Sequence, residues 1–477
     1  MINERKSDFL PILKHAKNYF GANLANKALG LISIPLFTRL LTPAEYGIIN
    51  IYNSYIAMTV VLLTLNAHAM IGRYYYEEKE DFNEFLGTTI FLSAALFLCT
   101  SLIYLVFIQK LHELSKLSPE LLGLILLATF LTVISSAYYQ IMAARQESKQ
   151  LAVNTVIQNY CGFLISILLI YIIEHGKYLG LVYGTLISSG IMSLFYAKKL
   201  LEYTKFVFRL KHCAYIIRNS FPLIPYSLSG VILAYIDRIM IGQASLSDAG
   251  LYSFSYNIAM LLTLVSSAMQ TAFMPNFFSL MNNRDYQPLY RTEKNIFSVT
   301  MFCALGLILY AKELVWILGD DKYHSAIGVI PPVVIGMIFL ALFDVYGKYI
   351  GYCNKNVWSS VILLSSGIIN ILLNYHFLPI YGYVAAAYTT AVSYFIMVLF
   401  TWLVTKYILA MPIMPLHLYL KTTSAFCILG GLFLILSALI REYWLIFLLK
   451  TVLLSVFLLF IMPTRNFLTN LKLTGGR

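Results

Sequence analysis

The chain has 477 residues, of which 59% are hydrophobic and only 12% are charged, whereas about 25% of the residues in a typical soluble domain are charged. This composition excludes a water-soluble protein. The net charge of +12 does not call for a nucleic-acid partner, because basic residues on the cytoplasmic side of a membrane protein account for it.

Apolar stretches long enough to cross a bilayer follow one another along the whole chain. A hydrocarbon core of about 30 Å needs a helix of about 20 residues. Fourteen such helices are expected, and a turn at 379–382 separates two of them. The fold class is therefore an all-α polytopic membrane protein, because lipid offers no hydrogen-bond partners to open strand edges. The expected spans are 18–38, 47–72, 85–109, 121–144, 150–173, 178–197, 219–242, 250–274, 295–318, 323–343, two within 357–404, 416–440 and 443–462.

The lysines and arginines are distributed unequally between the two sides of these helices. If the N-terminus is cytoplasmic, 23 of the 34 fall in cytoplasmic segments and eight in outer segments, and Lys27, Lys421 and Lys450 fall within spans. Cytoplasmic segments of membrane proteins are enriched in these residues, so we expect both termini in the cytoplasm. No small-residue cleavage site follows the first apolar run, so we expect an uncleaved first helix.

Two pairs of stretches repeat each other at offsets of 203 and 205 residues. RLLTPAEYGIINIYNSY at 39–55 resembles RIMIGQASLSDAGLYSFSYN at 238–257 and pairs Gly47 with Gly250, and GLVYGT at 180–185 resembles AAAYTT at 385–390 and pairs Tyr183 with Tyr388. The repeat predicts a six-helix lobe at 1–205, a second at 206–410, and two appended helices with a cytoplasmic tail at 411–477. Because six is an even number, the two lobes are parallel and leave a cleft between them, as in transporters.

Sequence motifs for metal, redox and nucleotide sites are absent. The six cysteines form no C-x-x-C pair, the eight histidines form no H-E-x-x-H motif, and there is no G-x-x-x-x-G-K-[ST] loop. Such patterns mark metal, redox and phosphate-binding sites. We therefore expect a transporter and not an enzyme, with no catalytic residues, no metal site and no cofactor.

Four motifs in this order resemble one family. They are FTRLLTPAEYG at 37–47, IDRIMIGQASLSDAGLYSFSYNIA at 236–259, FMPNF at 273–277 and IYGYVAAAYTTAVSY at 380–394. Their order and spacing resemble those of the polysaccharide transporter family, the Wzx-type flippases of the multidrug/oligosaccharidyl-lipid/polysaccharide exporter superfamily.

The resemblance implies a function in the bacterial cytoplasmic (inner) membrane. An undecaprenyl-pyrophosphate-linked oligosaccharide would pass from the inner to the outer leaflet by alternating access of the two lobes around a cationic cavity, and the glycan would feed O-antigen, capsule or a similar polysaccharide. The expected partners are the lipid-linked oligosaccharide and membrane lipids. A polysaccharide polymerase and a chain-length regulator are further candidates.

Charged residues in or near the spans are the candidate site, because a charge at the centre of a membrane helix costs about 2.5–3.5 kcal/mol on insertion scales. Lys27, with Asn23 and Asn26, is expected to bind the anionic head group, and a lysine paired with a neighbouring helix is the alternative. Arg73 ends the second expected helix and Arg145 ends the fourth, both on the expected cytoplasmic side. They are expected either at the substrate entrance or as ordinary membrane anchors.

The other candidates are assigned to gating, ion pairing and the lipid tail. Arg39, Asp237 and Arg238 lie near outer helix ends and are expected in a gate or a rim ion pair. Asp344 and Lys348 are four residues apart, which favours an ion pair on one helix. Lys421 and Lys450 belong to the two appended helices, which the resemblance assigns to a groove for the polyprenyl tail.

Three other functions stay open. A multidrug or cation antiporter and a lipid II flippase of the same superfamily would share the two lobes. An O-antigen polymerase or membrane glycosyltransferase would also be polytopic, but such enzymes are expected to have a long outer loop with acceptor and donor residues. The outer connections here, for example 110–118, 174–177 and 319–322, are short.

Overall fold

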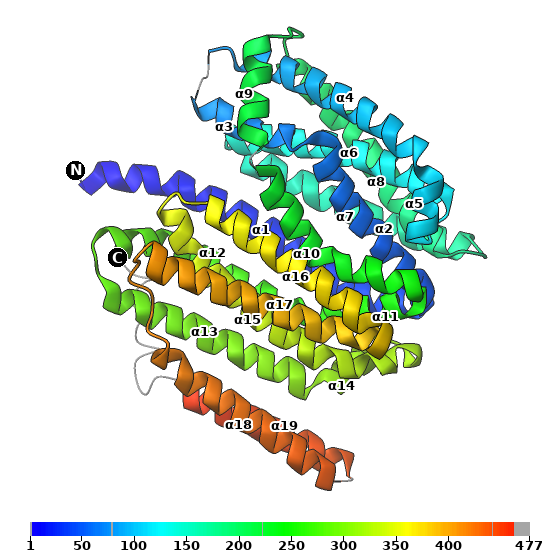
Figure 1. Ribbon diagram of the computed structural model, residues 1–477. Helices are drawn as coiled ribbons and strands as arrows, with labels where there is room; N and C mark the ends of the chain where they lie inside the picture. The colour runs from blue at the N-terminus through cyan, green and yellow to red at the C-terminus, as the bar shows by residue number, and fades with distance from the viewer. Residues whose placement is uncertain (1, 78–79, 222, 441, 462–477) are drawn as a thin grey trace. The chain divides into compact units, whose positions relative to one another are not determined.

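The computed structural model describes residues 2–77, 80–221, 223–440 and 442–461, and this part of the chain is helical, without a β-strand (Figure 1). Thirteen helices among the described residues are long and apolar enough to cross a membrane, and they correspond to the second to fourteenth expected spans. The first expected span lies in α1 (Ile2–Leu40), which is not among the thirteen. The all-α membrane fold is thus confirmed, while the cytoplasmic placement of both termini stays a prediction. The tail expected after residue 462 lies outside the described residues.

Packing divides the chain into two compact units. Unit 1 consists of Met1–Ser253 and Leu318–Lys322, and unit 2 of Phe254–Ile317 and Tyr323–Arg477. The lobes at 1–205 and 206–410 remain a prediction, because packing between helices does not measure internal duplication.

Besides α1, unit 1 contains α2 (Pro43–Thr64), η1 (Ala67–Ala69), α3 (Met70–Glu77), α4 (Phe82–Val106), α5 (Ile108–Ser115), α6 (Pro119–Ala144), α7 (Ser148–Ile172), α8 (Tyr178–Tyr203), α9 (Leu210–Ser220), α10 (Leu223–Ala244) and the first part of α11 (Leu246–Ala259).

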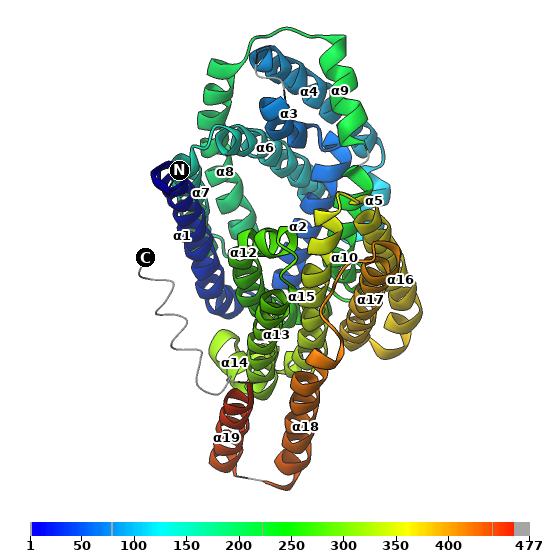
Figure 2. The same cartoon turned by 90° about the vertical axis from the view of Figure 1, so that its left-hand side faces the viewer.

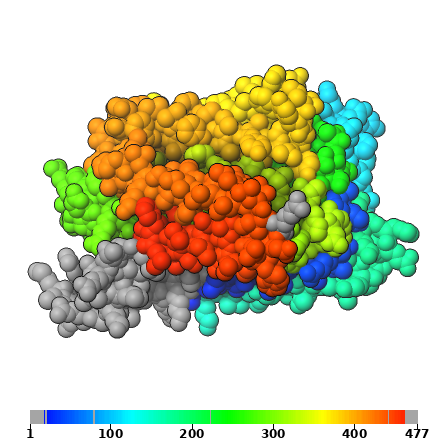
Figure 3. Space-filling model, turned by 90° about the horizontal axis from the view of Figure 1, so that it is seen from below, coloured from blue at the N-terminus to red at the C-terminus, as the bar shows by residue number. Residues whose placement is uncertain are grey.

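Unit 2 contains the helices of the second half of the chain. The two C-terminal helices pack against each other and against α13, and they lie side by side at the edge of the unit (Figure 2). Their side chains form a continuous layer on the face seen in Figure 3. The helices are α12 (Leu261–Asn282), α13 (Tyr286–Leu309), α14 (Ala311–Leu318), η2 (Asp321–Val329), α15 (Ile330–Tyr352), α16 (Val357–Tyr381), α17 (Tyr383–Leu403), the π-helix η3 (Val404–Ile408), α18 (His417–Leu439) and α19 (Tyr443–Ile461).

The second expected span, 47–72, is not one continuous helix. It begins with a capping box, in which the Thr42 side chain accepts from the Glu45 backbone and the Glu45 carboxylate accepts from the Thr42 backbone. Such a box satisfies backbone donors at a helix start. The helix ends at Thr64, because Leu65 and Asn66 both adopt left-handed backbone conformations. Arg73 therefore lies on the separate short helix α3 and not at the end of the second span.

The turn expected at 379–382 forms, but its position differs slightly. Helix α16 continues through Pro379 to Tyr381, and the chain turns at Gly382, whose φ is 67°. Glycine adopts such a φ without the cost that a Cβ imposes. Helix α17 then starts five residues before Tyr388, just as α8 starts five residues before Tyr183, which agrees with the repeat offset of 205.

A cluster of aromatic side chains holds one end of unit 1 together. The rings of Tyr74 on α3 and Phe85 on α4 stack at 3.7 Å, and those of Tyr138 on α6 and Tyr196 on α8 stack at 4.4 Å. All four side chains are buried in one core. This core fixes α3, which contains Arg73, and the end of α6, which precedes Arg145.

Candidate functional site

The α1 residues expected to bind substrate lie on a face turned away from α7. Tyr160 on α7 donates a hydrogen bond to the carbonyl oxygen of Ala25 (3.1 Å), so that side of α1 faces α7. Successive helical residues turn by about 100°, which places Asn23 and Lys27 opposite Ala25. Asn23 is exposed and Lys27 is half-buried. These two residues thus share one face of α1.

Asn26 differs from its two neighbours in the candidate site. Its side chain is half-buried, and its Oδ1 atom is buried without a hydrogen-bond donor in the described part of the chain. A buried acceptor without a donor is costly. Asn26 Oδ1 is therefore an unsatisfied acceptor next to Lys27 in the sequence, and no ligand can reach it in this structure.

The two arginines expected at the entrance have partners within unit 1. Arg73 donates from Nε to Glu77 Oε1 (2.6 Å) and from Nη1 to Asn219 Oδ1 (3.1 Å), and its side chain is 54% exposed. Arg145 follows α6 and lies with its guanidinium 4.1 Å from the centre of the Tyr203 ring. Both side chains retain surface that an anionic ligand can reach.

A second polar cluster, which the sequence did not predict, joins α9 to the loop before α4. Glu77 accepts hydrogen bonds from Tyr215 and Arg73, and these bonds lower the pKa of Glu77. Asp81 accepts from Lys211 Nζ (2.5 Å) and from the Tyr74 hydroxyl (2.7 Å). The hydrogen bond from Lys211, followed by that from Tyr74, holds the pKa of Asp81 well below its usual range. No local sequence pattern signals the contacts of α9, because its residues Lys211 and Tyr215 lie 130 and 138 residues from Asp81 and Glu77.

The repeat-related glycines Gly47 and Gly250 lie against each other's helix. A Cβ on Gly47 would overlap the carbonyl oxygen of Leu246, and a Cβ on Gly250 would overlap that of Pro43. The two hairpins that contain the similar stretches therefore meet backbone to backbone within unit 1. Helix α10 packs along α2 in the same region, where Gly242 faces Ile51.

The expected gate residues near this contact differ in burial. Asp237 and Arg238 on α10 are only 2% and 3% exposed, so they do not lie on an open rim. The Tyr252 hydroxyl donates to Asp237 Oδ2 (2.6 Å), and Arg238 Nη1 donates to the carbonyl oxygen of Ala234 (2.8 Å). Arg39 is exposed at the end of α1. Asp237 is thus held by the helix that follows it in the chain.

Lys348 is paired, but with a carboxylate on another helix. Its Nζ atom lies 3.7 Å from Glu293 on α13 and donates to Gln270 Oε1 on α12 (2.8 Å). Asp344, which the four-residue spacing favoured as the partner, is exposed on α15. Helix α13 begins at Tyr286 and so includes Glu293, a residue that the sequence analysis left in the connection before the expected span 295–318.

The two lysines of the appended helices have different surroundings. Lys450 is buried, and its Nζ donates to both carboxylate oxygens of Glu313 at 2.7 Å each. Lys421 is exposed and lies 4.8 Å from the centre of the Phe460 ring. Lys450 is therefore neutralised inside unit 2, and Lys421 alone of these two is accessible to a lipid head group.

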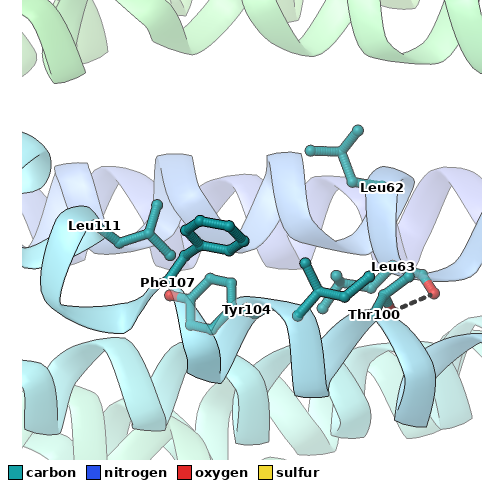
Figure 4. Close-up of a pocket in the computed structure, with 7 residues that line it drawn as sticks. Leu62, Leu63, Thr100, Tyr104, Phe107 and Leu111 are labelled. Atoms are coloured by element: carbon teal, nitrogen blue, oxygen red, sulfur yellow. Dashed lines mark hydrogen bonds between the residues drawn. The ribbon is translucent and has the colours of Figure 1, made fainter.

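A groove of about 310 Å³ in unit 1 contains none of these residues. Tyr104, Phe107 and Leu111 lie along one side of it, and Thr100 donates to the carbonyl oxygen of Leu63 at 3.4 Å (Figure 4). Its lining is almost entirely apolar, so it offers no group that would bind a phosphate.

A family model described as polysaccharide biosynthesis protein matches residues 12–281. The chain belongs to this family. The match includes Lys27, Arg73, Arg145 and the glycine pair, and it ends before Glu293 and Lys348. The family assignment, which confirms the resemblance in the sequence, thus rests on the half of the chain that carries the α1 site.

The chain is also similar to a protein of Haemophilus influenzae. The chain is 21% identical over 406 residues to Lsg locus putative protein 1 of Haemophilus influenzae, and the match covers 81% of this chain and 98% of that protein. Nearly the whole relative is therefore represented here.

Solved structures of membrane transporters share the fold of this family member. The lipid II flippase MurJ in an inward closed conformation matches with a TM-score of 0.72 and 16% identity, over 93% of this chain and 98% of that one. A multidrug resistance MATE family transporter of the MOP superfamily, in an inward-facing conformation, matches with a TM-score of 0.64 and 14% identity, over 82% and 96% of the two chains. The fold is that of this transporter superfamily.

Proposed function

We propose that this protein is a flippase for an undecaprenyl-pyrophosphate-linked oligosaccharide. It would carry the repeat unit from the inner to the outer leaflet of the bacterial cytoplasmic membrane for O-antigen or capsule synthesis. Membership in the polysaccharide biosynthesis family is the observation that carries this proposal. The transporter fold supports it.

The α1 face is the proposed contact for the anionic head group. Lys27 offers an ammonium with three donors, which can meet a phosphate as a point charge. Asn23 lies on the same face and is exposed, so its amide can contact a sugar hydroxyl. Fixed opposite charge replaces the water that the pyrophosphate loses, so this face lowers the cost of moving the head group through the bilayer.

Alternating access is the proposed mechanism. With both termini in the cytoplasm, Gly47 and Gly250 lie at the outer end of their helices, and their close contact would close the path on that side. Arg73 within α3 and Arg145 after α6, both partly exposed, would then meet the incoming cargo on the cytoplasmic side. A polysaccharide polymerase and a chain-length regulator are the partners we propose for the flipped product.

The test is the leaflet on which the linked repeat unit accumulates in a strain deleted for this gene. We expect accumulation on the inner leaflet, relieved by the wild-type protein and not by Lys27→Ala. Lys198→Ala, at an exposed lysine of α8 to which the proposal gives no role, is the matched control for loss of one positive charge. If the repeat unit reaches the outer leaflet in the deleted strain and only polymer is missing, the protein is a polymerase and not a flippase.

A lipid II flippase is the second candidate, because the MurJ fold matches over 93% of the chain. Complementation of a lipid II flippase deletion would favour it over the oligosaccharide flippase. A multidrug antiporter, the third candidate, would instead produce proton- or sodium-dependent drug efflux in proteoliposomes.

A further inference from the structure

The connection between α8 and α9, residues 204–209, is fixed to the first turns of α4, and it runs to α9 at the top of unit 1 in Figure 2. The Thr88 hydroxyl donates to the carbonyl oxygen of Val207 (3.1 Å) and accepts from the Arg209 backbone N–H (3.2 Å). A hydroxyl that both donates to and accepts from one segment holds its backbone in place. The α8–α9 connection therefore has a defined position although it contains no helix.

A glycine on α4 lets this connection approach closely. The carbonyl oxygen of Lys205 lies where a Cβ at Gly87 would be. The Lys205 backbone N–H donates to the carbonyl oxygen of Asn83 (2.9 Å). The connection thus lies directly on the backbone of α4 and covers it at this point.

Beyond these first turns, the surface of α4 faces lipid. Its buried residues all lie within 82–89, apart from Ser101. Exposed apolar side chains follow, among them Phe91 and Leu98. Because α4 is one of the thirteen helices able to cross a membrane, these side chains contact acyl chains. The α8–α9 connection therefore crosses α4 where its lipid-facing stretch begins.

The connection has a charged edge and an apolar edge along the axis of α4. Arg209 forms an ion pair with Glu84, in the first turn of α4. The ring centre of Phe206 lies 6.1 Å from that of Phe91. Glu84 and Phe91 are seven residues apart, which is about 10 Å along a helix. The charged edge thus lies toward the helix start, and the apolar edge lies toward the lipid-facing stretch.

Three large apolar side chains at this edge have no protein cover. Phe206 is 58% exposed, Phe208 is 52% exposed, and Leu210, the first residue of α9, is 78% exposed. They continue the lipid-facing surface of α4, because the Phe206 ring contacts that surface at Phe91. We propose that the α8–α9 connection, held by its contact with α4, is a membrane anchor whose apolar side chains insert among the acyl chains of the adjacent leaflet.

The physics of the interface sets the depth of this anchor. Open backbone is not tolerated in the hydrocarbon core, so the backbone of the connection lies at the level of the head groups. Side chains of interfacial segments reach about 5–10 Å further, into the boundary with the acyl chains. In the proposed topology this is the inner leaflet. The inference does not depend on which cargo the protein moves.

Spin labels on the full-length protein in vesicles of phosphatidylcholine and phosphatidylglycerol test the proposal. One label is attached at Phe208→Cys and another at Glu202→Cys, an exposed charged position in the last turn of α8, each in a background without the six native cysteines. Oxygen concentrates in hydrocarbon, whereas a nickel chelate stays in water. We expect the label at 208 to be several-fold less accessible to nickel, and more accessible to oxygen, than the label at 202.

Two results would overturn the proposal. Equal nickel accessibility at 208 and 202 would place Phe208 in water. A label at 208 that is shielded from both oxygen and nickel would mean that protein, and not lipid, covers this surface.

A second variant tests whether the contact with α4 holds the anchor. Gly87→Ala forces the Lys205 carbonyl away from α4, so the nickel accessibility of the label at 208 should rise toward that at 202. Gly123→Ala on α6, where nothing lies within 4 Å of the added Cβ, is the control and should leave it unchanged. If Gly87→Ala also leaves it unchanged, the contact with α4 does not hold the side chain in the membrane, and the proposal falls.

Discussion

Lys450 and Lys421 show how differently two lysines on neighbouring membrane helices are accommodated. Lys450 is 3% exposed and forms two hydrogen bonds of 2.7 Å to Glu313, to which the Tyr443 hydroxyl also donates (3.2 Å). Lys421 has an exposed side chain against a phenylalanine ring. A buried pair is sensitive to loss of one partner, because the remaining charge stays buried.

Lys450→Met should therefore destabilise the protein by about 3–5 kcal/mol, since Glu313 is left as an unpaired buried carboxylate. Thermal unfolding in detergent measures the effect. Lys421→Met, the control on α18, should leave the unfolding temperature nearly unchanged. The double variant Glu313→Leu with Lys450→Met should recover most of the stability lost in Lys450→Met. Equal destabilisation by Lys450→Met and Lys421→Met would contradict the assignment of Lys450 as the buried partner of Glu313.

The sequence identified Lys450 as a residue in need of a partner but could not identify that partner. Glu313 is 137 residues away, and a single sequence contains no signal for such a contact. The same holds for Lys348, where a carboxylate four residues away suggested a local pair. Packing of α13 on α15 brings Glu293 closer to the ammonium instead.

At the scale of elements, α9 is held to α3 and α4 by polar contacts rather than by an apolar core alone. Asn219 and Tyr215 on α9 contact Arg73 and Glu77 on α3. Asp81, which precedes α4, accepts from Lys211 and lies 3.0 Å from His212 Nε2. The segment that leads to α10 is thus anchored at several points.

The lowered pKa of Asp81 gives this anchoring a defined pH dependence. The ionised Asp81 carboxylate contributes its full stabilisation of the folded state above the pKa of an aspartate in an unfolded chain. This stabilisation is lost as the pH falls through the lowered pKa of Asp81. Hydrogen–deuterium exchange, corrected for intrinsic rates, should show α9 protected from neutral to mildly acidic pH. Asp81→Asn should expose α9 to faster exchange already at neutral pH.

The control for this experiment is Glu202→Gln, which removes the partner of Lys199 within α8. It should leave the exchange of α9 unchanged. Equal protection of α9 in Asp81→Asn and in the wild type would show that the carboxylate does not hold the helix.

Most membrane-spanning helices could be predicted from apolar length, whereas the irregular positions could not. The stretch around Leu65 and Asn66 contains neither proline nor glycine, and its asparagine is a weaker signal of a helix end than either of them. Two left-handed residues nevertheless end α2 there. At Pro379 the signal was present, but the helix continued past it to Gly382, because the glycine and not the proline adopts the turn conformation.

At the scale of the whole chain, two glycines that the predicted repeat pairs lie in close contact. The repeat pairs Gly47 with Gly250, and the structure packs each glycine against the other hairpin's backbone. Two residues that each pack against the other's backbone form a reciprocal contact, and each of them has to be a glycine. This explains why both stretches contain glycine at the same place.

Gly47→Ala should loosen this contact, because the added methyl group has no space beside the Leu246 carbonyl. Ile51 is 1% exposed and faces Gly242 nearby. A cysteine at position 51, in a background without the six native cysteines, should therefore react several-fold faster with a water-soluble maleimide in Gly47→Ala. Gly30→Ala, where nothing lies within 4 Å of the added Cβ, should leave the rate unchanged, and equal rates in the two variants would refute a tight contact.

The reciprocal glycine contact also limits how mutations can be compensated. Each added methyl group would meet a carbonyl oxygen and not a side chain, so no smaller side chain on the opposite helix can make room for it. A genetic screen for suppressors of Gly47→Ala should therefore find few changes at the contact itself. We expect suppressors at positions where the backbone can shift as a unit, such as the short connection before Pro43 or the end of α10. Because such a shift moves one hairpin against the other, we expect the sequences of the two hairpins to change together in descendants of this protein.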